Sequence, residues 1–157
     1  MPAFSREYRA DPVRYRRYGS RRNHLTKENA VHFASVRVIT ADVARLTDFY
    51  ETVTGCTARR HTPDFAEIPL PGATLAIGST ATVALFAAGS AEPASNRTAI
   101  VEFRVDDVDA EYTRLRDSID DLVQPPTTMP WGNRSLLLRD PDGTLVNLFT
   151  PPHRRLD

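Results

Sequence analysis

The residues that could carry out chemistry are few in this sequence, and they do not form a known catalytic motif. There is one cysteine, Cys56, and no glycine-rich phosphate loop, nucleophile elbow or HExxH zinc motif is found. Glu102 could serve as a general base. Arg37 and Arg104 could each bind a carboxylate or phosphate through two parallel hydrogen bonds. No motif fixes either role, so what these residues do depends on the elements that position them.

The composition is that of an ordinary globular protein. The 157 residues, 41% hydrophobic and 25% charged, fit one domain with or without a tail. Twenty basic and twenty acidic residues cancel, which argues against nucleic-acid or lipid binding by the whole surface. The lone cysteine excludes an intramolecular disulfide and favours a cytoplasmic location, and we interpret Cys56 as a packed apolar residue. No apolar run is long enough to span a membrane, and the N-terminus lacks a secretory signal.

Residues 1–30 differ from the rest of the chain in charge and texture. They hold eight basic and three acidic residues and no periodic apolar pattern. We predict a poorly ordered basic extension. Three tyrosines alternate with its arginines, a pattern that can grip single-stranded nucleic acid. A solvated tail, or an arm that docks on the body or on a partner subunit, is the favoured interpretation. Residues 153–157 are predicted to form a second, short tail.

A first structural unit is predicted over residues 31–89. The alternation within 33–39 is typical of a strand with one buried face. Asp42 can cap a helix and Gly55 can end it in the left-handed conformation. The apolar stripe of this helix consists of Val43, Leu46, Phe49, Tyr50 and Val53. The three strands expected to follow are 65–70, 73–77 and 81–87, each bounded by turn formers.

The same order of elements returns over residues 97–152. A strand at 99–105 precedes a second capping aspartate, Asp107, which lies 65 residues after Asp42. A short strand is predicted to begin at Leu122. The chain then closes with a hairpin of strands 134–139 and 144–150 around the turn 140–143. The repeat predicts an α+β domain of two βαβββ modules, with a curved mixed sheet around a cleft.

Several segments resemble the vicinal oxygen chelate superfamily, which includes glyoxalase I, fosfomycin-resistance thiol transferases, extradiol dioxygenases and bleomycin-binding proteins. Residues 36–50 resemble the family's first strand, aspartate cap and Phe-Tyr helix. Residues 103–110 resemble the start of its second module, and 130–132 with 139–149 resemble its last hairpin. The likeness covers about 120 residues and excludes 1–30. It implies the glyoxalase/bleomycin-resistance/dihydroxybiphenyl dioxygenase fold for residues 31–152.

The resemblance also identifies where metal-dependent members hold their cation. By position, three of the ligand sites fall on Ser35, Ile100 and Asn147, and the fourth falls within 81–87. Isoleucine has no donor atom, and serine and asparagine have no charge to offset the dehydration of a divalent cation. The histidines are expected at the surface: His24, His32, His61 in a loop, and His153 in the tail. We therefore expect no metal and no other cofactor.

The family register implies which side chains face the cleft. These are Ser35, Arg37, Ile100, Glu102, Arg104, Asn147 and Phe149, with Trp131 on a loop at one end. Such a set suits a polar, partly aromatic small molecule. Alternatively, Arg37, Glu102 and Arg104 pair with one another across the modules, and Trp131 only packs.

The sequence predicts a metal-free protein that binds a small molecule, as drug-resistance or sequestering members do. We expect a homodimer, with modules paired or swapped between chains as the resemblance implies, and no nucleic-acid or membrane partner. The alternative is an enzyme (a lyase, isomerase or dioxygenase) with atypical or absent metal ligands and Glu102 as its base. Whether the protein is an enzyme stays open at this point.

Overall fold

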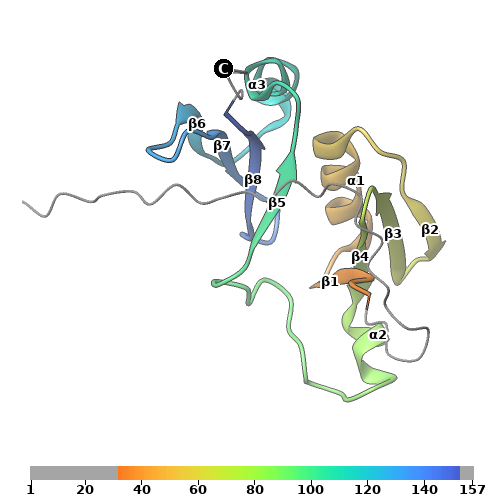
Figure 1. Ribbon diagram of the computed structural model, residues 1–157. Helices are drawn as coiled ribbons and strands as arrows, with labels where there is room; N and C mark the ends of the chain where they lie inside the picture. The colour runs from red at the N-terminus through yellow and green to blue at the C-terminus, as the bar shows by residue number, and fades with distance from the viewer. Residues whose placement is uncertain (1–31, 153–157) are drawn as a thin grey trace, which may run out of the picture. The chain divides into compact units, whose positions relative to one another are not determined.

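Two βαβββ modules follow one another in the computed structural model of the chain, which describes residues 32–152 (Figure 1). The first contains β1 (Ser35–Thr40), α1 (Val43–Thr54), β2 (Arg59–Thr62), β3 (Phe65–Leu70) and β4 (Ala73–Ser79). The second contains β5 (Ile100–Arg104), α3 (Val108–Leu115), β6 (Leu122–Thr128), β7 (Arg134–Arg139) and β8 (Leu145–Thr150). The predicted α+β fold is thereby confirmed. The predicted extension at 1–30 and tail at 153–157 lie outside the described residues.

Each module forms a four-stranded mixed sheet with the same topology. The strand orders are β1-β4-β3-β2 and β5-β8-β7-β6. In both, the first strand is parallel to the last and the other pairs are antiparallel. β1 and β5 therefore each keep one edge that pairs with no other described strand.

The two helices begin where the sequence predicts. The Asp42 carboxylate accepts a hydrogen bond from the backbone N–H of Arg45, and Asp107 accepts two in the same way. Gly55 ends α1 in the left-handed region with φ of 67°. The apolar stripe of α1 packs on its sheet, with Leu46 and Tyr50 fully buried. A helix thus packs on one face of each sheet, and the other face of the sheet stays open.

The first module differs from the prediction in two segments. Residues 81–87 were predicted as a strand, but Thr80–Ala84 forms the short helix α2. The Ser79 hydroxyl caps it by accepting from the N–H of Ala81, and alanine favours a helix over a strand. The third strand of the sheet is instead β2, at Arg59–Thr62, whose polar side chains hide the period of a half-buried strand. β2 is an edge strand that pairs with β3 alone.

The second module follows its prediction more closely. β7 has the predicted bounds, and the predicted turn leads into β8, with the N–H of Gly143 donating to the carbonyl of Asp140. β6 runs on through Pro125 and Pro126 as an edge strand. Proline is tolerated there because an edge strand leaves some N–H groups unpaired. Among the described residues, no helix is long and apolar enough to cross a membrane.

Candidate functional site

The first sheet carries a cluster of charged and aromatic side chains on the face away from α1. Strand register places Arg37 and Glu67 on either side of Ala76, and Phe65 lies beside Gly78. Buried Ile68 and Ile77 occupy the opposite, helix-covered face. We call the cluster the first-sheet face, and it consists of Arg37, Arg59, His61, Phe65 and Glu67 with Phe86 from the segment after α2.

Arg37 is held on this face by aromatic rings. Its guanidinium carbon lies 5.0 Å from the centroid of the Phe65 ring and 5.9 Å from that of Phe86. Such cation–π contacts are favourable and fix the plane of the guanidinium. Ser35, two residues earlier on β1, is exposed on the same side of the strand. The two site residues predicted on β1, Ser35 and Arg37, therefore lie on the same side of the sheet.

His61 belongs to the same face, although its sequence context predicts a loop. It lies on β2, its ring stacks on Phe65 with centroids 5.7 Å apart, and its Nε2 is 2.9 Å from a carboxylate oxygen of Glu67. The prediction of a loop residue was wrong because strand β2 was missed. His61 lies at an irregularity in the pairing of β2 with β3, where the register shifts between Arg60 and Thr62. Recognising a hairpin around the turn former Pro63 would have found it.

The second sheet presents a smaller polar group on its own open face. The Asn147 side chain on β8 donates from Nδ2 to Glu102 Oε1 on β5, at 2.8 Å. Its other atom, Oδ1, is buried and has no hydrogen-bond partner among the described residues. Leaving a buried acceptor unsatisfied costs about 1–3 kcal/mol. This second-sheet face consists of Ile100, Glu102, Arg104, Asn147 and Phe149.

The remaining predicted residues are placed as follows. Ile100 and Arg104 flank Glu102 on β5, and Phe149 is the register partner of Arg104. Trp131 lies in the turn before β7 and is 65% exposed. Among residues 32–152, Arg37, Glu102 and Arg104 form no ion pair with one another. The alternative of a closed salt-bridge network between the modules was therefore wrong, because these side chains belong to two separate groups.

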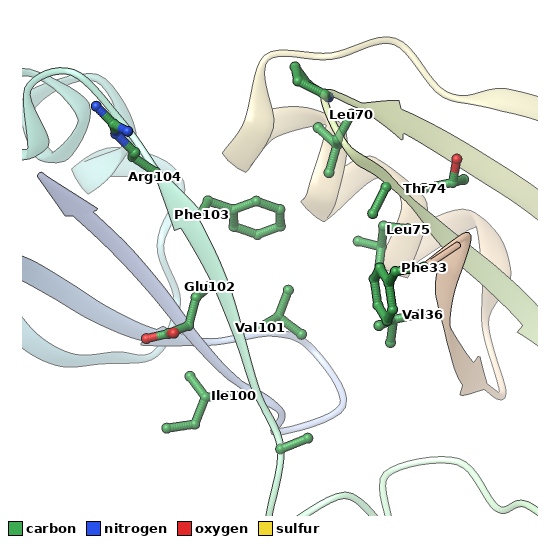
Figure 2. A pocket seen from close by; sticks show the side chains of 13 residues that line it. Phe33, Val36, Leu70, Thr74, Leu75, Ile100, Val101, Glu102, Phe103 and Arg104 are labelled. Atoms are coloured by element: carbon green, nitrogen blue, oxygen red, sulfur yellow. The ribbon is translucent and has the colours of Figure 1, made fainter. Parts of the chain in front are cut away.

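An apolar pocket of about 600 Å³ lies between the modules, on the other side of β5 (Figure 2). Val101 and Phe103 point into it, whereas Glu102 points away from it. Val36, Leu70 and Leu75 line it from the first module, with Phe33. Of the polar residues predicted to face a cleft, Glu102 and Arg104 border this pocket, whereas Ser35, Arg37 and Asn147 do not.

The donor set does not fit a divalent metal ion. Ser35, Ile100 and Asn147 occupy the predicted positions, and the first module ends with β4 rather than with a strand at 81–87. The β4 side chains on the open face are Thr74 and Ala76, which add no carboxylate or imidazole. No group of three or more His, Cys, Asp or Glu side chains gathers in the described part of the chain. Glu102 alone does not make a metal site.

The most strongly perturbed titratable groups connect the two modules. Tyr50 on α1 is fully buried and donates its hydroxyl hydrogen to Asp140 Oδ2 in the β7–β8 turn, at 2.9 Å. Burial, followed by the Asp140 charge, raises the pKa of Tyr50. Burial also raises the pKa of Asp140, against the opposing hydrogen bonds from Tyr50 and from the N–H groups of Thr144 and Asp142. Arg45 reaches the same turn through an ion pair with Asp142 at 2.8 Å.

Comparison with known proteins agrees with this architecture. A family model described as the Glyoxalase/Bleomycin resistance protein/Dioxygenase superfamily matches residues 30–148. The chain therefore belongs to this superfamily, as the resemblance implied. No curated protein matches the chain.

Solved structures show the same fold. One is a glyoxalase/bleomycin resistance protein/dioxygenase from Nocardioides, with 26% identity and a TM-score of 0.65, covering 81% of this chain and 87% of that one. A family enzyme from Burkholderia phytofirmans PsJN has 17% identity and a TM-score of 0.68, covering 76% and 98%. TioX from Micromonospora sp. ML1 has 24% identity and a TM-score of 0.57, covering 77% and 98%.

Proposed function

We propose that the protein binds a small organic molecule on the open faces of its sheets, without a metal ion. The observation that carries this proposal is the pair formed by Asn147 and Glu102, in which the amide donates to Glu102 Oε1 at 2.8 Å and no described residue donates to Oε2. Glu102 is exposed, so an N–H or O–H group of a ligand can reach Oε2 and donate to it. Binding without turnover would serve to sequester a drug or a metabolite, and we place this role in the cytoplasm because the chain has a single cysteine.

A thermal-shift screen of drug-like and metabolite-like compounds tests this proposal. A compound that binds only the folded protein raises the melting temperature. At a concentration of a hundred times its Kd, it adds about 2.7 kcal/mol to the free energy of unfolding. For a hit that uses the second-sheet face, Asn147→Leu should abolish the shift. The control is Asn133→Leu, in the loop before β7, which should keep it. Hits that respond to no substitution on either face would refute the proposal.

A second candidate function is catalysis by Glu102. The Asn147 amide holds one oxygen of this carboxylate, so the other oxygen has a fixed direction in which to take a proton. Once a hit is identified, its conversion can be followed by mass spectrometry. Glu102→Gln should then remove turnover while the affinity changes little. Turnover that persists in Glu102→Gln would exclude this role.

We further propose that a second copy of this chain covers the pocket between the modules. Phe33, Val36 and Ile100 at its rim are 68%, 47% and 50% exposed, which is unusual for side chains so apolar. The unpaired edges of β1 and β5 lie beside them. A twofold axis allows each copy to cover the other's pocket with the same surface.

Light scattering during size-exclusion chromatography tests this assembly. We expect twice the chain mass of 17.5 kDa for the natural sequence. Val36→Glu should give the monomer mass, because it places a charge on the apolar rim. Leu85→Glu is the control, since Leu85 is even more exposed but lies outside the pocket. A monomeric natural protein would refute the proposed dimer.

A further inference from the structure

Arg37 stands out among the arginines of the open faces because its position is fixed without an anionic partner. The rings of Phe65 and Phe86 lie 5.0 and 5.9 Å from its guanidinium carbon. No carboxylate of the described residues forms an ion pair with it. Aromatic rings against a guanidinium cover its faces and leave the N–H groups at its edge free. The arginine is therefore positioned for an acceptor that the described residues do not supply.

The charges around Arg37 favour an anion as that acceptor. The first-sheet face carries a second arginine, Arg59, which is the register partner of Glu67 on the neighbouring strand. Glu67, the face's single carboxylate, is already hydrogen-bonded to His61. Two cations against one occupied carboxylate leave the face positive. A planar carboxylate fits the paired N–H groups of a guanidinium edge better than a spherical anion does.

The same face offers ring surfaces beside the arginine. His61 stacks on Phe65 with an angle of 27° between the ring planes, so the two form a short aromatic stack. Phe86 lies at the other side of Arg37 and is 79% exposed, which leaves its ring free for contact. Exposed ring surface next to a fixed guanidinium suits a flat aromatic group attached to the carboxylate.

We propose, on the basis of the function proposed above, that the first-sheet face binds a planar aromatic carboxylate. Arg37 donates its edge N–H groups to the carboxylate, and the aromatic part of the ligand packs on Phe86 and on the stack formed by His61 and Phe65. This proposal narrows the ligand from small molecules in general to one chemical class. Neutral aromatic compounds should bind poorly because they lack the carboxylate, and aliphatic acids should bind poorly because they lack the aromatic ring.

Isothermal titration calorimetry of the full chain with 2-naphthoate tests this inference. We expect binding that weakens at least tenfold, or about 1.4 kcal/mol, in Arg37→Met, which keeps the apolar stem but loses the charge. Phe86→Ala should weaken binding several-fold. Arg116→Met is the matched control, because Arg116 is an exposed arginine outside the sheets, and it should bind like the natural protein. The neutral analogue 2-naphthalenemethanol should bind at least tenfold more weakly.

Three results would overturn the inference. They are no binding of 2-naphthoate at millimolar concentration, equal binding in Arg37→Met, and equal binding of the neutral analogue. Circular dichroism of each variant establishes that it is folded, and Phe86 is exposed enough for its removal to leave the core intact. If 2-naphthoate fails but the thermal-shift screen gives hits that depend on Asn147, the ligand class is wrong and the proposed function stands.

Discussion

Replacing Tyr50 by phenylalanine removes a single hydrogen bond between the two modules. The hydroxyl of this fully buried residue donates to Asp140 Oδ2, which is itself nearly inaccessible to solvent. The ring is retained, so its edge-to-face contacts with Phe49 at 5.1 Å and Phe103 at 6.3 Å persist. The substitution therefore isolates the hydrogen bond from the packing, and we expect it to destabilise the protein.

The expected loss can be worked out from the partners. A hydrogen bond to a charged group contributes about 1.5–3 kcal/mol, and no other described residue donates to Asp140 Oδ2. Unfolding entropy near the melting temperature is about 2.1 cal/mol/K per residue, or about 0.25 kcal/mol/K for about 120 structured residues. A loss of about 2 kcal/mol thus lowers Tm by about 8 °C.

Calorimetry of Tyr50→Phe and of the control Tyr112→Phe measures this loss. Tyr112 on α3 is half-buried, and its hydroxyl has no hydrogen-bond partner among the described residues, so its loss should cost less than about 0.5 kcal/mol. A double-mutant cycle with Asp140→Asn should give a coupling of about 1 kcal/mol or more. Equal Tm changes for the two tyrosine variants, or no coupling, would refute the inter-module hydrogen bond.

Three further predictions concern charged groups. Burial raises the pKa of Asp140 above its value in the unfolded chain. The free energy of unfolding of the natural protein, relative to that of Asp140→Asn, should therefore be greatest below about pH 4. It should fall as the pH rises through the folded-state pKa, as measured by urea titrations. The hydrogen bond from the N–H of Ala58 is the main cause that lowers the pKa of Glu51. The natural protein should therefore be more stable than Glu51→Gln above about pH 5, and this difference in stability should be lost in acid. A difference that does not depend on pH would contradict this prediction. Arg114→Gln removes donors to the last carbonyls of α1 and should cost about 1 kcal/mol in urea unfolding, against almost nothing for Arg116→Gln; equal losses would contradict this role.

Local signals in the sequence predicted much of the fold. The capping aspartates and Gly55 predicted where the helices begin and where α1 ends, because each satisfies or permits a specific backbone geometry. The closing hairpin was equally well marked by its turn residues. These features depend on neighbours in sequence, and they were confirmed for that reason.

Features that depend on tertiary contacts were missed. β2 is polar on both sides because Arg60 pairs with Asp48 and Glu51 of α1 while His61 turns to the other face. Its sequence therefore shows no alternation of apolar and polar residues. The apolar run at 81–87 suggested a strand, but the segment is short, alanine-rich and capped by a serine. Periodicity alone does not separate these cases.

Strand alternation predicted which face of a sheet a side chain lies on, but it did not predict which side chains meet there. The alternation of residues along β5 predicts that Glu102 lies on the opposite face of the strand from Val101 and Phe103, as the structure has it. It did not reveal that Arg37 rests on Phe65 and Phe86, which are 28 and 49 positions away in sequence. The Tyr50–Asp140 hydrogen bond, whose partners are 90 positions apart, could not be predicted from the sequence either. Such contacts follow from tertiary packing, within a module or between the two, and leave no local pattern.

The central claim is that this member of the superfamily binds its ligand with side chains alone. The most direct test of this claim is the affinity for a ligand found in the screen, measured by calorimetry. The affinity is measured before and after removal of metal with EDTA, and again after addition of Zn²⁺, Mn²⁺ or Ni²⁺. The donor set of Ser35, Ile100 and Asn147 predicts an affinity unchanged within twofold throughout. Loss of binding on chelation that is restored by a stoichiometric metal ion would contradict the account.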